Sequence, residues 1–314
     1  MEPLKIGLIG AGGFASHTLH PALHLAPVAV QAVCDMDEAR GQRAANKFGS
    51  GRHYTDHHEM WEKEDLEGVA ICMGPGPRQA LVLEALAAGY HVFVPKPPAS
   101  TVAATEALAE AAERAGKTMS VNFQRRFSHA SRQAKAIMAT DDFGDLTQLF
   151  CSFCSGGYGS REDYLLDFAI HHFDLCRHLG GNVRRLASME NFVGGQASFA
   201  VSLEFESGAV GLLQLNSQRL WARNYDRIEL TGQGSYLVSD DLWTIRHYTG
   251  DTNTFTENYS DERNGELSGD GHSLTEWVTA IREDREPTAS IQDGVETMRL
   301  YEAVLACPTG IVTL

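Results

Sequence analysis

The turn at residues 10–15, with the sequence GAGGFA, constrains the fold of this chain more than any other feature. An apolar run over residues 4–10 leads into it, and a stretch of helical composition follows to residue 24. In a G-x-G-x-x-A turn, the first glycine allows the tight turn and the second lets the backbone approach a pyrophosphate. The small last residue allows close packing of helix on strand. The pattern therefore predicts a strand–turn–helix unit that binds a dinucleotide.

Asp35 supports this interpretation, because it ends the next apolar run at the position where an acidic residue contacts ribose hydroxyls. Glycines alone also mark ordinary turns, but the strand, turn, helix and Asp35 are in the expected register. A carboxylate here repels a 2′-phosphate, which favours NAD over NADP. Arg40 and Arg43 follow directly and keep NADP possible.

Strand-like and helix-like segments alternate as far as residue 121. Apolar runs at 28–34, 69–73, 90–94 and 118–121 are separated by helical stretches at 37–48, 77–88 and 101–115. Such alternation is typical of a doubly wound parallel sheet. We expect a Rossmann domain over residues 1–121.

The pattern changes in the remainder of the chain, residues 122–314. Alternating segments now occur in adjacent pairs, 197–205 with 209–215 and 227–231 with 235–238, each pair joined by a short glycine-containing turn. Paired strands of this kind form hairpins. Residues 250–271 are polar and predict a long irregular segment, and helices are expected at 273–284 and 292–306. We expect an α+β domain with a large, mostly antiparallel open sheet.

Composition excludes several classes of partner. Lys and Arg number 26 against 41 Asp and Glu, a net charge of −15. Nucleic acids and anionic membranes require a basic footprint, so neither is expected as a partner. Among six cysteines, only Cys151 and Cys154 have C-x-x-C spacing, and on a strand they point to opposite faces, so no metal site is expected. The first residues do not resemble a secretory leader and no apolar stretch approaches about 18 residues, so we expect a cytoplasmic protein.

Lys96 lies between prolines directly after the fourth apolar run. Ligands of open α/β sheets bind at the carboxyl ends of the strands, where this lysine is placed. Pro95 and Pro97 restrict the backbone on both sides and present the side chain in one direction. The functional interpretation is a cation that polarises a substrate oxygen beside the nicotinamide; the alternative is a solvated lysine in a stiff loop.

A stripe of titratable residues lies along residues 167–178. At about 100° per residue, Asp167, His171, Asp174 and His178 fall within one narrow sector of a helix, and apolar residues occupy most of the remainder. This predicts a buried helix whose polar stripe lines a cleft. A histidine oriented by a carboxylate suits general acid–base catalysis near neutral pH. A metal site and a merely structural stripe are the alternatives.

Together these elements resemble the glucose–fructose oxidoreductase / inositol dehydrogenase / rhizopine catabolism family, usually called Gfo/Idh/MocA. The resemblance covers nearly the whole chain. Its carriers are the turn at 10–15, Asp35, the segment VPKP at 94–97, the segment NFQRRF at 122–127, and the pattern Asp167-x-x-x-His171-x-x-Asp174. The resemblance implies an NAD(H)-dependent oxidoreductase that acts on a sugar, an inositol or a related polyol, and that forms dimers or tetramers through its open sheet.

The resemblance also implies roles for individual residues. The matching lysine binds the reacting hydroxyl, the matching histidine is the general acid–base, and the matching aspartate supports it, so Lys96, His171 and Asp167 are the expected catalytic residues. The expected cofactor-binding residues are Gly10, Gly12, Gly13, Phe14, Ala15, Asp35, Arg40, Met73 and Lys96. The expected substrate-binding residues are Lys96, Asn122, Arg126, Tyr158, Asp167, His171 and Asp174.

The chain departs from the family pattern at two places. The family usually has Glu-Lys-Pro where this chain has Pro95-Lys96-Pro97, and commonly Thr-Pro and a later His where this chain has Met73-Gly74 and Arg78. The lysine is retained, so hydride transfer is the expected chemistry. A non-catalytic NAD-binding sensor and an enzyme that uses bound NAD transiently for elimination or hydrolysis remain as alternatives.

Overall fold

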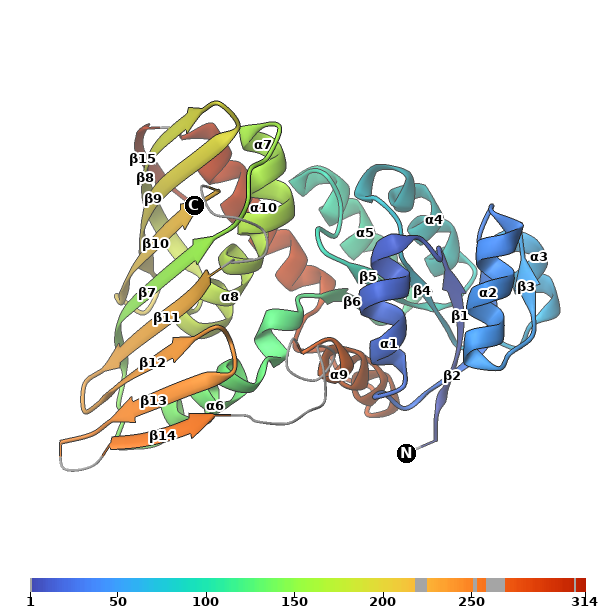
Figure 1. Ribbon diagram of the computed structural model, residues 1–314, viewed down its shortest axis with the longest axis horizontal. Coiled ribbons are helices and arrows are strands. Elements are labelled where there is room, and N and C mark those ends of the chain that lie inside the picture. The colour runs from blue at the N-terminus through green and yellow to red at the C-terminus, as the bar shows by residue number, and fades with distance from the viewer. Residues whose placement is uncertain (1, 218–224, 251–252, 258–268, 308) are drawn as a thin grey trace. The chain divides into compact units, whose positions relative to one another are not determined.

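The computed structural model describes residues 2–217, 225–250, 253–257, 269–307 and 309–314. The chain forms two compact units (Figure 1). Unit 1 comprises Met1–Gln124 and Glu262–Val295, and unit 2 comprises Arg125–Asp261 and Glu296–Leu314. The sequence predicts one boundary, between residues 121 and 122; the structure adds a return of the chain to unit 1 before it ends in unit 2.

Unit 1 is built on a six-stranded parallel sheet, which confirms the predicted Rossmann-like architecture. Its strand order, β3-β2-β1-β4-β5-β6, reverses direction of winding at β1, as doubly wound sheets do. The strands are β1 (Leu4–Ile9), β2 (Val28–Cys34), β3 (His53–Tyr54), β4 (Gly68–Ile71), β5 (His91–Pro95) and β6 (Met119–Asn122).

The helices of unit 1 begin and end where local sequence dictates. Asp37 and Thr101 accept main-chain N–H bonds at the starts of two helices, and Gly49 and Gly116 end the same helices in left-handed conformation. The elements are η1 (Ala15–Leu19), α1 (His20–Leu23), α2 (Glu38–Phe48), α3 (His57–Lys63), α4 (Pro75–Ala87), α5 (Val102–Ala115), α9 (Asp270–Arg282) and the start of α10 (Ile291–Ala306).

One hydrophobic cluster joins the sheet of unit 1 to helices from both ends of the sequence. Leu8 of β1 and Phe93 of β5 share it with Leu23 of α1 and Trp277 of α9. The ring of Trp277 is fully buried, lies 5.5 Å from that of Phe93 and covers Gly68, where an added Cβ would meet it at 3.1 Å. Helix α9 is therefore part of the Rossmann core despite its distance in sequence.

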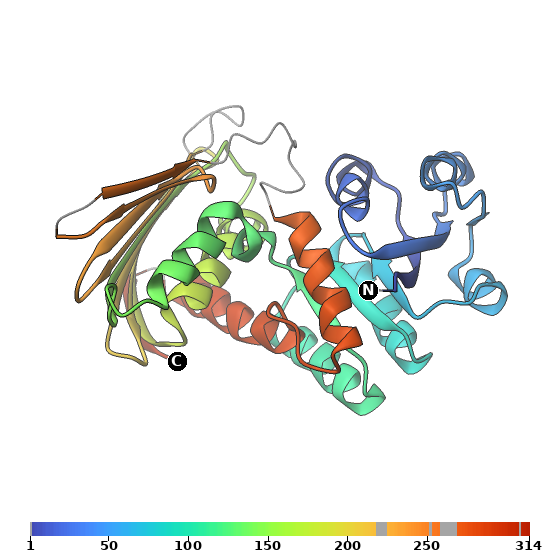
Figure 2. The same ribbon diagram turned by 90° about the horizontal axis from the view of Figure 1, so that it is seen from below.

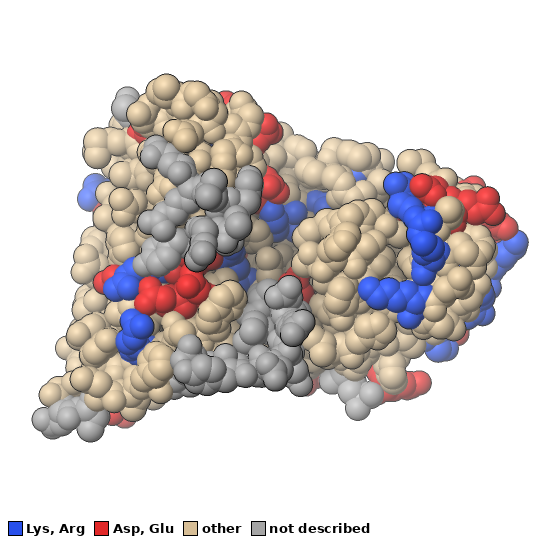
Figure 3. Space-filling view, in the orientation of Figure 1, with Lys and Arg blue, Asp and Glu red and all other residues tan. Residues whose placement is uncertain are grey.

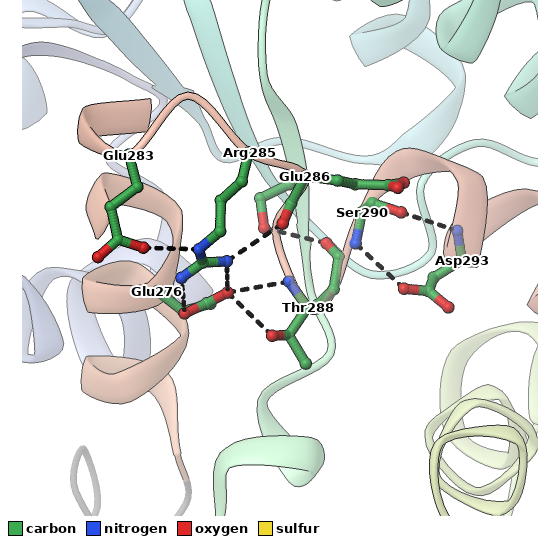
Figure 4. A network of polar contacts seen from close by, with 9 residues as sticks. Glu276, Glu283, Arg285, Glu286, Thr288, Ser290 and Asp293 are labelled. Carbon is green, nitrogen blue, oxygen red and sulfur yellow. Dashed lines mark hydrogen bonds and ion pairs between the residues drawn. The ribbon is translucent and has the colours of Figure 1, made fainter. Parts of the chain in front are cut away.

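The connection between α9 and α10 is held by a polar network (Figure 4). Arg285 forms a two-pronged ion pair with Glu276 of α9, at 2.6 and 3.0 Å, and its Nε donates to Glu283 at 2.7 Å. Glu276 Oε1 also accepts from the main chain and hydroxyl of Thr288, at 3.0 and 2.9 Å. The segment then lies beside β6, where Ser120 Oγ donates to the carbonyl of Ala289 at 3.0 Å.

Unit 2 is built on a nine-stranded sheet of order β14-β13-β12-β11-β7-β10-β9-β8-β15. Only β7 and β10 pair in parallel; the other neighbours are antiparallel, including the two predicted hairpins. The strands are β7 (Leu146–Cys154), β8 (Val183–Val193), β9 (Gln196–Phe205), β10 (Val210–Asn216), β11 (Tyr225–Gly232), β12 (Tyr236–Asp240), β13 (Thr244–Tyr248), β14 (Asn253–Glu257) and β15 (Thr309–Thr313).

Part of the segment expected to be irregular, residues 250–271, is ordered. Residues 253–257 form β14, which extends the sheet by pairing with β13, and α9 already begins at Asp270. The polar side chains of this edge strand hide its periodicity. Two further parts of the predicted segment, residues 251–252 and 258–268, lie outside the described residues.

Helices cover one face of the sheet in unit 2 and leave the other bare (Figures 1 and 2). They are α6 (His129–Met138), α7 (Arg161–Asp163), η3 (Tyr164–Ala169), α8 (Ile170–Gly180) and the larger part of α10, while the short η2 (Gln124–Phe127) leads into the unit. No helix among the described residues is both long and apolar enough to cross a membrane.

Candidate active-site residues

Gly10 makes the turn after β1 possible in two ways. Its φ of +92° belongs to the left-handed region, which side chains disfavour. An added Cβ would also lie 2.3 Å from the carbonyl oxygen of Cys72, at the end of the neighbouring β4. No other residue type fits here.

The two glycines that follow face open space. A Cβ at Gly12 or Gly13 would meet no atom within 4 Å, while Ala15 is buried, as close helix–strand packing requires. Both glycines line a cavity of about 330 Å³ in unit 1, together with Ala11, Ser16, His20, Arg40, Arg43, Ala44 and Lys47. Phe14 points away from the core and is exposed.

Asp35 is held at the end of β2 by its neighbours. Its Oδ2 accepts from the main-chain N–H of Ala11 at 2.7 Å, and its Oδ1 accepts from that of Asp37 at 2.8 Å and from Arg40 Nη2 at 3.1 Å. Burial raises the pKa of the carboxyl group, but these hydrogen bonds and the Arg40 charge outweigh burial, so the net pKa lies below its usual value. Asp35 is therefore ionised at neutral pH.

The cavity residues fit a dinucleotide. Lys and Arg side chains gather between α1 and α2 (Figure 3), and Arg40, Arg43 and Lys47 are the cations of the cavity wall. These cations and the uncrowded glycine turn suit a pyrophosphate, and the Asp35 carboxylate suits ribose hydroxyls. The residues present therefore fit NAD.

Lys96 follows β5 at the carboxyl edge of the same sheet. It is half-buried, and Pro95, directly before it, pairs in register with Asn122 of β6. The Asn122 amide donates to Asp270 Oδ1 at 2.6 Å. Met73 follows β4 at this edge. Lys96, Asn122 and Met73 thus come from three adjacent strand ends of unit 1.

Arg78, to which the sequence pattern assigns no role, is buried in the same region. It is 1% exposed in the first turn of α4, and its guanidinium donates to the carbonyls of Met73, Pro97 and Pro98. The sequence holds a signal for it: Arg78 continues the apolar stripe of Leu81, Val82 and Ala85, where a cation needs buried partners.

Two of the stripe residues of unit 2 lie on different kinds of helical turn. Asp167 belongs to η3, a π-helical segment, and is exposed, whereas His171 lies on α8 and is buried. Tyr158 Oη donates to Asp167 Oδ2 at 2.8 Å, which brings two predicted substrate-binding residues together. Burial, followed by the Asp167 carboxylate, raises the pKa of Tyr158. A π turn has a wider period than an α turn, so a uniform 100° step misplaces Asp167 relative to His171.

Arg126 and Asp174, both predicted to bind substrate, are bonded to each other. Arg126 Nε and Nη2 donate to the two oxygens of Asp174 at 2.8 and 2.6 Å, and Thr297 of α10 donates to Oδ1 at 3.3 Å. Both side chains are buried. His178, the last stripe residue, is half-buried; burial and then the Arg126 charge lower its pKa to about 3, so it is neutral.

A second buried charge cluster lies beside the stripe. Asp226 of β11 accepts from Arg125 Nη1 at 2.6 Å, and its other oxygen lies 2.6 Å from Nε2 of His172. Burial alone lowers the pKa of His172, but Cys151 and Asp226 raise it above its usual value. Sequence reasoning missed this cluster, because Asp226 is far from α8 in the chain and no local pattern marks it.

One group of three possible metal ligands lies together in the described part of the chain: Asp56, His57 and His58 of unit 1. It includes none of the predicted site residues, and His57 Nε2 lies 3.2 Å from Glu84 Oε2.

The parallel sheet, the glycine turn and the Asp35 carboxylate are those of a dinucleotide-binding domain. Two family models agree. The NAD-binding Rossmann-fold domain of the Gfo/Idh/MocA oxidoreductase family matches residues 4–123, and the C-terminal alpha/beta domain of that family matches residues 163–307. The chain belongs to this family and is an NAD-dependent oxidoreductase, which confirms the predicted class and cofactor.

The similarity to known dehydrogenases covers nearly the whole chain. D-apiose dehydrogenase from Paraburkholderia graminis is 26% identical, over 96% of this chain and 87% of that protein. Myo-inositol 2-dehydrogenase from Thermotoga maritima is 24% identical, over 93% and 92%. The crystal structure of a dehydrogenase from Chromobacterium violaceum has the same fold, with a TM-score of 0.90, 23% identity and coverage of 98% and 95%.

Proposed function

We propose that this enzyme oxidises a ring or chain hydroxyl of a small polyhydroxylated compound, a sugar, an inositol or a derivative, with NAD+ as the hydride acceptor. The observation that carries the proposal is the position of Lys96, a half-buried cation at the carboxyl edge of the NAD-binding sheet. The names of the relatives, D-apiose dehydrogenase and myo-inositol 2-dehydrogenase, support the substrate class, since apiose and inositol both carry neighbouring hydroxyls.

The proposed chemistry assigns a task to each catalytic residue. Bound NAD+, held by the glycine turn and Asp35, would supply the acceptor for a hydride from the hydroxyl carbon. His171 removes the hydroxyl proton, so the products are a carbonyl compound, NADH and a protonated histidine. Lys96 stabilises the negative charge that develops on the oxygen. Asp167, which accepts from Tyr158, orients His171 or a neighbouring hydroxyl.

Asn122, Tyr158, Arg126 and Asp174 complete the proposal as substrate-binding residues. The mutual ion pair of Arg126 and Asp174 favours a contribution as one rigid unit rather than as two independent contacts. For the cofactor, we propose a preference for NAD(H) over NADP(H), since Asp35 is ionised and already engages Arg40.

A panel of polyols, sugars and cyclitols, each incubated with the enzyme and NAD+, tests the function by NADH absorbance. Stoichiometric NADH formation with at least one compound is the expected result. Product formation without net NADH would instead indicate transient use of the cofactor. Failure of every compound, with NADH binding intact, would count against oxidation of this substrate class.

We also propose that two or four copies associate through the bare face of the nine-stranded sheet. That face carries exposed apolar side chains on separate strands, including Met189 of β8, Leu212 of β10 and Ile311 of β15. A second copy would remove them from water.

All six cysteines are free thiols, which supports the proposal of a cytoplasmic location.

A further inference from the structure

Arg78 is a buried cation with main-chain carbonyls as its hydrogen-bond partners among the described residues. Its Nη1 donates to the carbonyl of Met73 at 2.8 Å, and its Nη2 donates to the carbonyls of Pro97 and, at 3.2 Å, Pro98. Burial lowers the pKa of the guanidinium to about 10, so burial disfavours its charge, and the N-terminal turn of a helix disfavours a cation as well. The burial of this charged side chain is unfavourable by itself, so its hydrogen bonds to the three carbonyls must offset that cost.

The three carbonyls belong to two loops at neighbouring strand ends, the loop after β4 and the loop after β5, which holds Lys96. Met73 lies in the loop that follows β4, and Pro97 and Pro98 follow Lys96 directly. Because Pro95, Pro97 and Pro98 have no N–H, this segment has few main-chain donors of its own, and its buried carbonyls need donors from elsewhere. Arg78 supplies them with one rigid planar group.

The segment is also fixed from another side. A Cβ on Gly294 of α10 would lie 3.2 Å from Pro98 and 3.4 Å from Val121, so Pro98 packs closely on the bare glycine backbone. Pro98 thus lies between an Arg78 donor and the Gly294 backbone, and Arg78 also holds Pro97, the residue directly after the half-buried Lys96.

We infer that Arg78 is a positioning residue for Lys96: it fixes the loop after β5 so that the lysine amine is presented in one direction for hydride transfer. The inference rests on the proposed role of Lys96. It differs from a general stabilising role, because the effect of Arg78 on turnover must then pass through Lys96.

A double-mutant cycle separates these roles. Arg78→Gln removes the three donated hydrogen bonds, and displacement of a reacting group by about 1 Å can cost on the order of 100-fold in rate. We expect Arg78→Gln to lower kcat by about 10- to 100-fold on the most active compound of the polyol panel. In the Lys96→Ala background, the same substitution should change kcat little. In either background, Arg78→Gln should leave the Kd for NADH nearly unchanged.

The outcomes distinguish the inference from the function on which it rests. If Lys96→Ala leaves kcat unchanged, the proposed catalytic role of Lys96 is wrong. If Lys96→Ala is impaired but Arg78→Gln lowers kcat equally in both backgrounds, Arg78 has only a structural role and the inference is overturned.

Arg282→Gln is the matched control. Arg282 also lies in unit 1, where it donates to the carbonyl of Pro3 and forms an ion pair with Glu67.

The chemical reactivity of the Lys96 amine can be measured without a substrate. Trace acetylation with acetic anhydride, read by mass spectrometry, compares Lys96 with the exposed Lys63 in the same molecule. We expect the Lys96/Lys63 labelling ratio to rise several-fold in Arg78→Gln, to return part of the way in Arg78→Lys, which keeps a shorter donor, and to stay unchanged in Arg282→Gln. An unchanged ratio in a folded Arg78→Gln protein overturns the inference.

Discussion

Asp35, the proposed partner of a ribose, also accepts a hydrogen bond from Arg40 at 3.1 Å and anchors the glycine turn through the main-chain N–H of Ala11. We therefore expect discrimination between the two nicotinamide cofactors to depend on this carboxylate and on the arginine that it engages.

Asp35→Ser should weaken NADH binding and relax the preference against NADPH. The loss of charge-assisted hydrogen bonds predicts about a 10- to 100-fold weaker Kd for NADH. Release of Arg40 leaves a cation beside the 2′ position, so NADPH should lose much less or gain. Fluorescence titration of both cofactors measures the ratio. Equal or tighter NADPH binding by the unmodified enzyme would contradict the assignment of Asp35.

Lys96 and His171 should be required for turnover but not for the fold or for most of the affinity for NADH. General acid–base groups are typically worth about 10²–10⁴-fold, so His171→Ala should lose rate on that order. A preorganised electrostatic contact is worth roughly 10²–10³-fold, which is the expected loss for Lys96→Ala. Steady-state kinetics and NADH titration of each variant provide the comparison. Near-normal turnover in both variants would favour the sensor alternative.

His20, buried beside the nucleotide cavity, should make unit 1 sensitive to acid. Burial, followed by the Lys47 charge, lowers its pKa to about 4, against about 6.5 in an unfolded chain. Below pH 6.5 the unfolded state binds the proton and the folded state does not, so stability falls until pH 4. From this residue the free energy of unfolding should be about 2 kcal/mol lower at pH 5 than at pH 7.

Urea unfolding of the native chain and of His20→Gln, at both pH values, isolates this contribution. The variant should lose less stability between pH 7 and pH 5 than the native chain does. Equal losses would place the histidine's pKa near its ordinary value and contradict the prediction.

Among the elements, the strand–turn–helix units and the hairpins followed from local patterns, because their apolar period and turn residues lie within a few positions. The π-helical turn of η3 did not, since the same residues fit an α-helix equally well. Nor did the partners of Arg78 or of His172, because carbonyls of Pro97 and Pro98 and the carboxylate of Asp226 reach these residues only through the tertiary fold.

The connection between α9 and α10 illustrates an element that depends on one side chain. Glu276 accepts from Arg285 and Thr288, and these hydrogen bonds, against the effect of burial, lower its pKa. Glu276→Gln should cost about 1 kcal/mol in the free energy of unfolding, because the bidentate ion pair between this half-buried carboxylate and the more exposed Arg285 is lost. Thermal or urea unfolding measures it. Glu296→Gln, which breaks an exposed pair with Arg299, should cost much less.

At the scale of the whole molecule, the bare sheet face leads to a prediction of self-association. Leu212 lies in register between Ser202 of β9 and Phe150 of β7, at the middle of that face. Leu212→Lys would bury a charge in an interface with a second copy, and the assembly should dissociate to the 34.3 kDa chain. Light scattering at micromolar concentration reads the mass. Met36→Lys, a change of the same kind at an exposed residue of unit 1, should leave the mass unchanged; a monomeric native protein would refute the proposal.

The return of the chain to unit 1 over residues 269–295 affects the order in which the protein can fold during synthesis. A ribosome releases the strands of the Rossmann sheet early, but Trp277 and the rest of α9, which complete its hydrophobic cluster, emerge only after almost all of unit 2 has been synthesised. Until then the nascent sheet exposes the apolar surface around Gly68 and Phe93 that Trp277 will cover. The nucleotide-binding unit is thus the first to be synthesised but among the last to complete its hydrophobic core. A nascent chain that stalls before residue 277 should therefore expose apolar surface that chaperones bind.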